Sequence, residues 1–503
     1  MEQRRPPVLV MAAVAFGVFV AADDLTVVST MLRQIIGDLD IPLPSGFDDA
    51  AWIVNSYLVA YVAVMPFMGR LSDLVGRRKV YVGALVVFLA GSLWIPFTSS
   101  LGWFIAARVL TAMGGGAMVP VALAVIGDLY DVDRRPRAYG ILGAVDTIGW
   151  VWGPLFGALL VRFLDWRWQF YLNVPLALIG IAVAWWALRD FDRPTVRASI
   201  DWPGAGVLTG ALVALNIALL DTTEIAVVSE LEELSGRGSV STTWLFGVAA
   251  AGFVLFWWLE RRAEDPIIDL RLFRARNFSA GVGVNFLVGA VLIVAMVDVP
   301  LFVNLVVETS LEEAAVMSGW VLSGLTAAMA VTSYLGGVAT ERTWYRPVII
   351  TGLVITGVGF LIVGTAWDAD IGPWTMGWQL VILGIGFGLV TAPTNAAVVD
   401  SAPDAQRGTA AGLVIVARLM GLAVGLSGLT AWTLFRFDRL RQDLDLPGIG
   451  EPGYREALEL AQADITAQSL TETFLVAAVV AVAAVAVAML LRDRRANQPV
   501  APE

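Results

Sequence analysis

The sequence contains no cysteine and no histidine. Without cysteine the chain forms no disulfide and no thiolate metal site, and without histidine it has no imidazole to serve as a base, proton carrier or metal ligand. Charge is also scarce, because only 15% of the residues are Asp, Glu, Lys or Arg, against about 25% in a typical soluble domain. Any group that handles protons must therefore be a carboxylate, and we predict no metal site and no cofactor.

Long polar stretches are missing as well, and apolar residues dominate the chain. Hydrophobic residues make up 58% of it and the mean hydropathy is +0.74. The net charge of -11 argues against a nucleic-acid partner. Apolar runs of membrane-spanning length follow one another along nearly the whole sequence. We predict an all-α membrane protein with 14 spanning helices at about 8–36, 51–68, 80–98, 101–128, 138–163, 170–188, 202–221, 243–260, 278–307, 315–338, 347–366, 376–399, 409–435 and 467–491.

The distribution of basic residues predicts the orientation of these helices. An even number of spans leaves both termini on one side of the membrane. Of the 33 Lys and Arg residues, 23 lie on that side, eight lie on the other, and Arg108 and Arg418 lie within helices. The positive-inside rule therefore predicts cytoplasmic termini and a multi-pass protein of the bacterial cell (inner) membrane. The first apolar run is longer than that of a signal peptide, so it should remain as a helix.

Two outer segments have a predictable character. Residues 436–466 have helix-forming sequence on both sides of a Pro/Gly turn at Leu446–Gly453, which predicts a helical hairpin that continues the last two helices beyond the membrane. A merely solvated loop is the alternative. Residues 222–242 contain four glutamates and are expected to form a flexible acidic loop.

Two patterns in the first part of the chain recur in the second. The segment Gly69–Lys79, "GRLSDLVGRRK", lies between the second and third predicted helices; its glycines permit a tight turn, and its aspartate can cap or face a helix N-terminus. The segment "GVATERTWYR" repeats its outline, with Gly337, Glu341 and Arg346 in the places of Gly69, Asp73 and Arg78.

The second pattern repeats with a constant offset. The spacing Gly140-x5-Asp146-x2-Gly149-x3-Gly153 reappears 272 residues later as Gly412-x5-Arg418-x2-Gly421-x3-Gly425. The chain therefore reads as a duplicated six-helix unit, a common transporter architecture. We predict an N-terminal half at 1–190, two inserted linker helices within 191–277, and a C-terminal half at 278–503.

These motifs are similar to those of a known family. "GRLSDLVGRRK" resembles the loop signature of the major facilitator superfamily, "DTIGWVWGPLFGALL" the helix 5 motif of its antiporters, and "DPIIDLRLFRARNF" the linker of its fourteen-helix drug:proton antiporter branch. "WIVNSYLVAYVAVMPFMGRLSDLVGRRK", "MVDVPLF" and "VARLMGLAVGLSGLTAWTLFRFDRL" are similar to the mycobacterial triacylglyceride exporters.

The resemblance implies a function and a partner. It implies a proton-coupled secondary exporter of a lipid such as triacylglyceride, working as a monomer by alternating access. Those exporters act with a periplasmic lipid-carrying lipoprotein, which becomes an expected partner here beside protons and membrane lipid. The alternative is a proton-coupled multidrug efflux antiporter for small amphiphilic compounds. A passive pore is also left open, whereas the missing histidine argues against a membrane acyltransferase.

The resemblance also assigns structural roles. It implies a conformational latch and a set of helix-packing residues. The expected latch residues are Gly69, Asp73, Gly76, Arg77, Arg78 and Asp128, and the expected packing residues are Gly149, Gly153, Pro154, Gly157, Gly421 and Gly425.

Six charged residues fall within predicted spans, and they are the candidates for function: Asp23, Asp24, Arg108, Asp146, Asp298 and Arg418. A charge in the hydrocarbon core costs at least a few kcal/mol, so such residues normally face a cavity or a partner. Asp24 begins an Asp-x-Thr pattern, which favours it over Asp23 as the functional acid, because neighbouring helical residues point about 100° apart. Asp23 and Asp298 are candidates for the pathway, and an interfacial position for Asp23 and Asp24 is the alternative.

Arg418 cannot lose its charge, so it needs a carboxylate partner. Asp24 is the first choice and Asp146 the second. We hypothesise that the acid alternates between a protonated, unpaired state and an ionised state paired with Arg418; a structural lock without a proton role is the alternative. Arg108 is expected to assist proton transfer or to be a structural partner near the outer surface. The glycines at 114–116 lack the Lys-Ser/Thr of a phosphate loop, which indicates helix packing.

Overall fold

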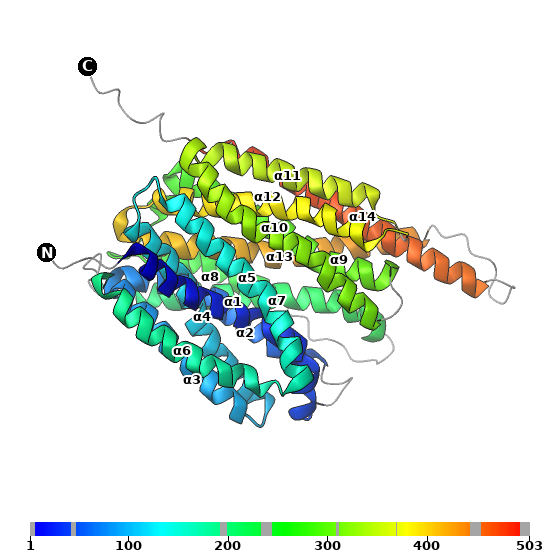
Figure 1. The fold of residues 1–503 in the computed structure, drawn as a ribbon, viewed down its shortest axis with the longest axis horizontal. Helices are drawn as coiled ribbons and strands as arrows, with labels where there is room; N and C mark the ends of the chain where they lie inside the picture. Colours follow the sequence, from blue (N-terminus) through cyan, green and yellow to red (C-terminus); the bar gives the residue numbers. More distant parts are fainter. Residues whose placement is uncertain are drawn as a thin grey trace, which may run out of the picture.

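The computed structural model describes residues 6–41, 47–191, 199–232, 244–307, 311–368, 370–442 and 454–492. This part of the chain is helical and contains no strand, and its long helices run side by side in one bundle (Figure 1). Their bounds are α1 Pro7–Asp38, α2 Phe47–Val75, α3 Arg77–Trp94, α4 Leu101–Leu129, α5 Arg135–Phe163, α6 Arg167–Ala187, α7 Trp202–Glu232, α8 Trp244–Glu260, α9 Arg276–Phe302, α10 Leu311–Thr343, α11 Tyr345–Ala366, α12 Pro373–Asp400, α13 Arg407–Gln442 and α14 Tyr454–Ala488.

The helices are long and apolar enough to cross a membrane. Among the described residues, 13 helices reach spanning length and hydropathy, and α8 is a shorter apolar helix of 17 residues. Large apolar side chains cover the outside of the bundle; Trp103, Phe163 and Trp374 are 59%, 69% and 75% exposed. Such a surface suits lipid rather than water. The all-α membrane fold with 14 apolar helices is therefore confirmed, with α8 as the shortest.

The two ends of the bundle differ. α1 begins and α14 ends at the same end, on the left of Figure 1, which we call the termini end. At the opposite end α13 continues to Gln442 and α14 starts at Tyr454, so both helices run beyond the predicted limits, and α14 projects past its neighbours (Figure 1). Arg436 of α13 pairs there with Glu472 of α14. We call this the hairpin end; the predicted turn at Leu446–Gly453 lies outside the described residues.

The prediction of a flexible acidic loop from residue 222 is wrong for its first half. α7 continues to Glu232 without a break, because the chain has no glycine or proline between Asp221 and Gly236 to end the helix. The remainder of that segment lies outside the described residues.

The segment expected as a loop between the second and third helices is almost entirely helical. α2 extends to Val75 and α3 begins at Arg77, so Gly76 alone makes the turn, with φ 110° and ψ 139°. Glycine is essentially the only residue that adopts this conformation without strain. In the second half of the chain Trp344 makes the equivalent turn between α10 and α11, with φ 77° and ψ 176°. Gly69 therefore has no turn to make, and its role is packing.

Glycines let pairs of helices approach closely within each half. A Cβ at Gly149 or Gly157 of α5 would lie 2.9 Å or 2.8 Å from backbone oxygens of α1. In α13, Gly421 and Gly425 lie equally close to α9, where a Cβ would collide with the carbonyl oxygens of Phe286 and Ala290. Pro154 lies inside α5 directly after Gly153. Small residues thus allow backbone contact in the two equivalent helix pairs.

The glycines at 114–116 lie in the middle of α4 and are fully buried. A Cβ at Gly114 would lie 2.6 Å from the Ala84 carbonyl oxygen, and one at Gly116 would lie 2.5 Å from that of Tyr61. This is the helix packing that the sequence indicated.

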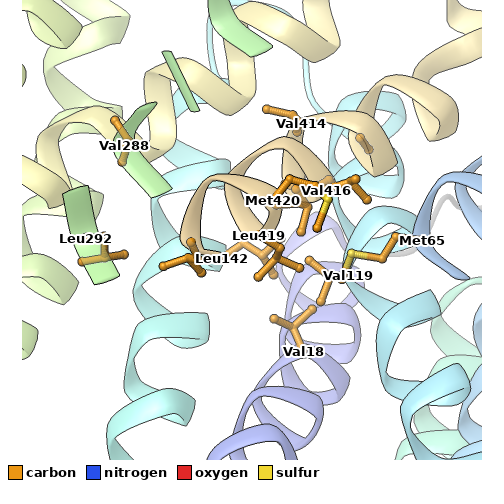
Figure 2. Close-up of a cluster of buried hydrophobic side chains, with 14 of the residues drawn as sticks. Val18, Met65, Val119, Leu142, Val288, Leu292, Val414, Val416, Leu419 and Met420 are labelled. Atoms are coloured by element: carbon orange, nitrogen blue, oxygen red, sulfur yellow. The ribbon is translucent and has the colours of Figure 1, made fainter. Parts of the chain in front are cut away.

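Apolar side chains fill the region where the first and last thirds of the chain meet. Figure 2 shows Val18, Met65, Val119, Leu142 and Leu419 converging from α1, α2, α4, α5 and α13 on one buried cluster. The side chains labelled there are aliphatic or methionine, so the polar groups described below lie in a largely apolar surrounding of low dielectric.

α9 changes its geometry after Pro300. The proline lies inside the helix, and residues Val303–Val307 continue as a π-helical turn. The Asn304 side chain donates a hydrogen bond to the Pro300 carbonyl oxygen at 2.6 Å. The irregularity matches the expected effect of a proline that lacks an N–H donor.

Replacing Gly421 by alanine should lower the free energy of unfolding by about 1–3 kcal/mol, because the new methyl group overpacks the contact with α9. Gly428 lies on the same helix with nothing within 4 Å of its Cβ position, so Gly428→Ala isolates the gain in helix propensity. Thermal unfolding in detergent, followed by tryptophan fluorescence, should rank Gly421→Ala well below Gly428→Ala. Equal midpoints for the two variants would contradict this packing role.

Candidate functional site

Asp24 and Arg108 form an ion pair in the centre of the N-terminal half. The Arg108 Nη1 lies 2.8 Å from the Asp24 Oδ2, and both side chains are fully buried. The Asn173 side chain of α6 donates to the other Asp24 oxygen at 3.0 Å. The guanidinium also stacks over the Tyr57 ring, 4.2 Å from its centroid. Both carboxylate oxygens are thus satisfied in the ionised state, and Arg108 is fully buried as the structural partner of Asp24.

Asp23 points to a different partner. Its Oδ2 accepts a hydrogen bond from the Gln169 side-chain amide at 2.9 Å. Its Oδ1 is buried without a partner, and so is the Oε1 of Gln169. Asp23 is only 6% exposed, and no ion pair to it occurs in the described part of the chain. Both Asp23 and Asp24 are therefore buried inside the bundle.

Arg418 pairs with Asp146 and not with Asp24. The Arg418 Nη2 lies 3.1 Å from the Asp146 Oδ2, so the bond joins α13 to α5 and the two halves to each other. Our first choice, Asp24, is wrong because Arg108 of α4 already occupies that carboxylate. The 272-residue offset that relates Arg418 to Asp146 in sequence also relates them in space, as equivalent positions of the two halves.

A small cavity adjoins this pair. It has a volume of about 30 Å³ and is lined by Asp146, Arg418 and apolar side chains of α9, α10 and α13. That volume holds a single water molecule. A second, apolar groove of about 240 Å³ lies between α5 and α10, and Thr326 lines both.

Asp298 lies on α9, 7% exposed, and its Oδ2 has no hydrogen-bond partner. It does not line either of the two spaces next to the Asp146–Arg418 pair. Its position on α9, one turn before the π-helical residues, leaves it a candidate for the pathway without a contact to the rest of the site.

The predicted latch residues meet at the termini end. Arg77 lies 2.6 Å from Asp73 and 3.1 Å from Asp128, and Asp128 also binds Arg407 of α13 at 2.9 Å. Asp73 accepts hydrogen bonds from the backbone N–H groups of Gly408 and Thr409, at 3.1 and 3.2 Å. Its carboxylate therefore faces the positive N-terminus of α13 in the other half.

Of the three remaining latch residues, Gly76 makes the turn between α2 and α3, and Gly69 and Arg78 lie beside this network. Gly69 touches Gly408 so closely that a Cβ on it would collide with the Gly408 carbonyl oxygen. Arg78 stacks over Trp185 of α6, 3.8 Å from the ring centroid. These contacts join α2 and α3 to α13 and to α6.

A second pair across the halves escaped our sequence analysis. Arg135 of α5 lies 2.7 Å from Asp400 of α12, which also accepts a hydrogen bond from Tyr345. Asp400 and Arg407 stand 272 residues after Asp128 and Arg135, so the Asp128–Arg407 and Arg135–Asp400 pairs are reciprocal. The offset already found for the helix 5 motif was the signal that could have revealed them.

The two sets of contacts differ at the N-termini of α5 and α13. Pro136 occupies the position equivalent to Gly408, and Gly337 lies as close to the Pro136 carbonyl oxygen as Gly69 does to that of Gly408. Because proline has no N–H, it cannot donate to a carboxylate, and Glu341, the counterpart of Asp73, is exposed. Of these two contacts, the one between α2 and α13 has a buried carboxylate at a helix N-terminus and the one between α10 and α5 does not.

The site contains no metal centre in the described residues, since no three acidic side chains gather closely enough to hold a metal ion there. The polar groups that sequence reasoning missed are Gln169 and Asn173 of α6, which hydrogen-bond to Asp23 and Asp24. Their presence in an apolar helix could have revealed them, because buried polar side chains need hydrogen-bond partners.

Asp24→Asn should lower the free energy of unfolding by about 3–5 kcal/mol, because it leaves the Arg108 charge buried without a counter-ion. Adding Arg108→Gln removes that charge and should recover much of the loss. Thermal unfolding midpoints of the wild type, both single variants and the double variant close the cycle. If the destabilisation of the double variant equals the sum of those of the two single variants, Asp24 and Arg108 do not interact energetically.

Asp73→Asn should open the termini end more often, because the amide loses the charge that faces the N-terminus of α13. A loss of about 1–2 kcal/mol corresponds to a factor of about 5–30 in the open population. The chain has no cysteine, so Ala410→Cys, at a fully buried position of α13, provides a single thiol whose labelling rate by a water-soluble maleimide reports opening. Glu341→Gln is the matched control and should leave the rate unchanged; equal rates in the two variants would contradict the asymmetry.

Comparison with known proteins now places the chain in a family. The family model described as Major Facilitator Superfamily matches residues 14–426 and 286–503. The triacylglyceride transporter of Mycobacterium tuberculosis is 32% identical over 449 residues, covering 86% of this chain and 83% of that protein. Multidrug resistance protein 3 of Bacillus subtilis is 29% identical over 425 residues, covering 83% of this chain and 78% of the relative.

Solved structures agree on the fold. The human organic anion transporter MFSD10 superposes with a TM-score of 0.61 at 16% identity and covers 95% of this chain and 100% of its own. The proton:xylose symporter XylE superposes with a TM-score of 0.59 at 14% identity, covering 95% and 94%. Because the family model matches more than half of the chain and the Mycobacterium tuberculosis relative is 32% identical over 86% of it, the chain belongs to the Major Facilitator Superfamily and is a multi-pass membrane transporter, not an enzyme.

Proposed function

We propose that the chain is a proton-coupled exporter of a neutral lipid such as triacylglyceride. The proposal depends above all on one observation: the Asp146–Arg418 ion pair joins the two halves beside a mostly apolar cavity. Moving a proton onto Asp146 would remove its attraction to Arg418 and so weaken a direct link between the halves. That step ties the proton to the rocking of the halves that alternating access requires.

Accessibility supports Asp146 as a site of proton exchange. The Asp146 and Arg418 side chains are 14% and 10% exposed, whereas those of Asp24 and Arg108 are 0% exposed. Since a proton has to arrive through water or a polar chain, the pair at the cavity is the better placed of the two. In this proposal Asp24 and Arg108 organise the N-terminal half, and Asp146 and Arg418 respond to the proton.

The surroundings of the pair support an apolar cargo. The cavity wall is mostly apolar: beside the charged pair it is lined by Leu292, Met296, Leu325, Met329, Leu422, Trp150 and the two threonines Thr147 and Thr326. The groove between α5 and α10 is lined by Ile148, Trp152 and Leu155, which are exposed on the outer face of α5. Acyl chains could therefore pass between the bilayer and the centre along an apolar surface once α5 and α10 separate.

The names of relatives agree with either of two cargoes. Triacylglyceride transporters of mycobacteria share 29–32% identity with this chain, which favours lipid. Multidrug transporters of Bacillus subtilis share 29–30%, and a carboxylate at an apolar cavity would also suit a cationic amphiphile. Export of small amphiphilic drugs is therefore the second candidate.

The proposal includes an orientation and a partner. The excess of Lys and Arg at the termini end, 23 against eight, supports cytoplasmic termini in the cell membrane. The hairpin end would then face outward, where the extensions of α13 and α14 offer a surface beyond the membrane. A lipid-carrying lipoprotein on that side would complete the transfer from a monomeric exporter.

The test uses purified protein in proteoliposomes with an imposed pH gradient, labelled triacylglycerol in the membrane and, in parallel, a cationic dye. Proton-driven transfer of triacylglycerol to an external acceptor is expected for the wild type. Asp146→Asn should abolish the response to the gradient, because an amide cannot take up or release the proton that controls pairing with Arg418. Asp133→Asn, at an exposed position between α4 and α5, is the control and should behave as the wild type.

Three outcomes would count against the proposal. Transfer of the dye alone would favour drug export. Transfer that ignores the pH gradient in the wild type would indicate a passive pore. Full proton-driven transfer by Asp146→Asn would remove Asp146 from the coupling step.

A further inference from the structure

The Asp23 carboxyl group is buried with too few hydrogen bonds, and no counter-ion among the described residues, to stabilise its ionised form. One oxygen receives a single hydrogen bond, from Gln169, and the other has no partner. A buried charge is costly unless a counter-ion or several hydrogen bonds compensate for it. Asp24, the next residue, shows the compensated arrangement, with a guanidinium at 2.8 Å and an amide donor at 3.0 Å.

The groups left without partners at Asp23 form a complementary set. Gln169 donates through its Nε2 to Asp23 Oδ2, while Gln169 Oε1 and Asp23 Oδ1 are both buried acceptors without a donor. A carboxylic acid has one O–H donor in addition to its acceptors, and an amide has both donor and acceptor atoms. One proton on Asp23 Oδ1 would therefore supply a donor for Gln169 Oε1, in the cyclic pairing that acids and primary amides form.

The structure assigns Asp23 as a carboxyl group that is neutral in this conformation and that holds an exchangeable proton, with Gln169 as its positioning residue. The inference rests on the proton-coupled function proposed above and adds a second proton site to it. Asp24 is less suited to the role, because its oxygens are already satisfied by Arg108 and Asn173 and both members of the Asp24–Arg108 pair are 0% exposed.

The neighbouring elements contain few charges that face Asp23. On α1 itself the adjacent charged group is Asp24, which is neutralised by Arg108 of α4. α6 contributes the uncharged amides Gln169 and Asn173, α2 contributes Tyr57 beside Arg108, and α5 contributes Asp146, which is paired with Arg418. No unpaired cation among these groups compensates for an ionised Asp23.

Loss of the Asp23 proton would affect two sets of contacts. Gln169 also donates to the Asn173 side chain at 3.4 Å, and Asn173 donates to Asp24, so a reoriented Gln169 changes the support of the Asp24–Arg108 pair. Asp23 also lies at the closest approach of α1 and α5, where a Cβ at Gly153 would lie 2.8 Å from the Asp23 carbonyl oxygen. Both contacts belong to the N-terminal half, away from Arg418.

The position of the acid fits a proton that enters from the hairpin end. Gln169 lies in the first turn of α6, whose N-terminus is at that end, whereas Asp73 and Asp128 of the latch bind the start of α13 at the opposite end. In the orientation proposed above, Asp23 would load its proton from outside, which is the direction an exporter driven by proton entry requires.

The test combines infrared spectroscopy with transport. Purified wild-type protein at neutral pH should show the C=O stretch of a buried, protonated carboxyl group, and Asp23→Asn should remove it. Asp298→Asn is the control, because Asp298 is also buried with an oxygen lacking a partner; its substitution should leave the Asp23 band in place. Asp23→Glu keeps a carboxyl group and should shift the band rather than abolish it.

In proteoliposomes Asp23→Asn should bind cargo and exchange it at equilibrium but lose at least tenfold of its proton-driven accumulation, since the amide mimics the neutral acid permanently. A band that persists in Asp23→Asn, or unchanged proton-driven accumulation, would overturn the assignment. If Asp23→Asn does not fold, an unchanged band in Asp23→Glu overturns it and a shifted band supports it. Failure of the wild type to respond to a proton gradient would refute the proposed function instead, and the band measurement would still decide the state of Asp23.

Discussion

A guanidinium keeps its positive charge at any pH that a cell experiences, and this property decides how the interior of the bundle is arranged. Arg108 and Arg418 lie among apolar helices, and each has a carboxylate within hydrogen-bond distance. The two pairs differ in what they join. Arg108 and Asp24 connect helices of one half, so their separation would only damage that half, whereas Arg418 and Asp146 connect the halves, so their separation changes how the halves fit together.

The duplicated unit gives the termini end two seams of similar construction. At each seam an acid at the end of one helix binds an arginine at the start of a helix in the other half. The seams are not equal, because Gly408 offers an N–H to Asp73 and Pro136 has none to offer. A duplicated scaffold can thus keep its shape while only one of its seams contains the charge at a helix N-terminus. The seam without that charge joins α5 and α10, the same two helices that line the apolar groove further along.

Periodicity and charge distribution could predict the helices, the hairpin extension and the residues that carry charge in the interior. Hydropathy identifies spans well because a bilayer leaves so few alternatives for the backbone. The ion-pair partners of these charged residues were harder to predict. The requirement that Arg418 has a carboxylate partner follows from its chemistry, but the choice between Asp24 and Asp146 depends on Arg108 being close to Asp24, which only the three-dimensional packing decides. The end of α7 was missed because four glutamates suggested a loop, although nothing in the segment ends a helix before Gly236.

Trp344 makes the turn between α10 and α11 in a backbone conformation that otherwise belongs to glycine, as Gly76 does in the other half. Such a conformation costs of order 1–3 kcal/mol for a residue with a side chain, and persists only where the surroundings enforce it. Trp344 lines a small space together with Pro136 and Asp133 at the seam between α5 and α10. If that seam opened, the backbone at Trp344 could relax to an unstrained conformation. The turn in the C-terminal half therefore stores conformational strain that favours opening, whereas the Gly76 turn in the N-terminal half stores none.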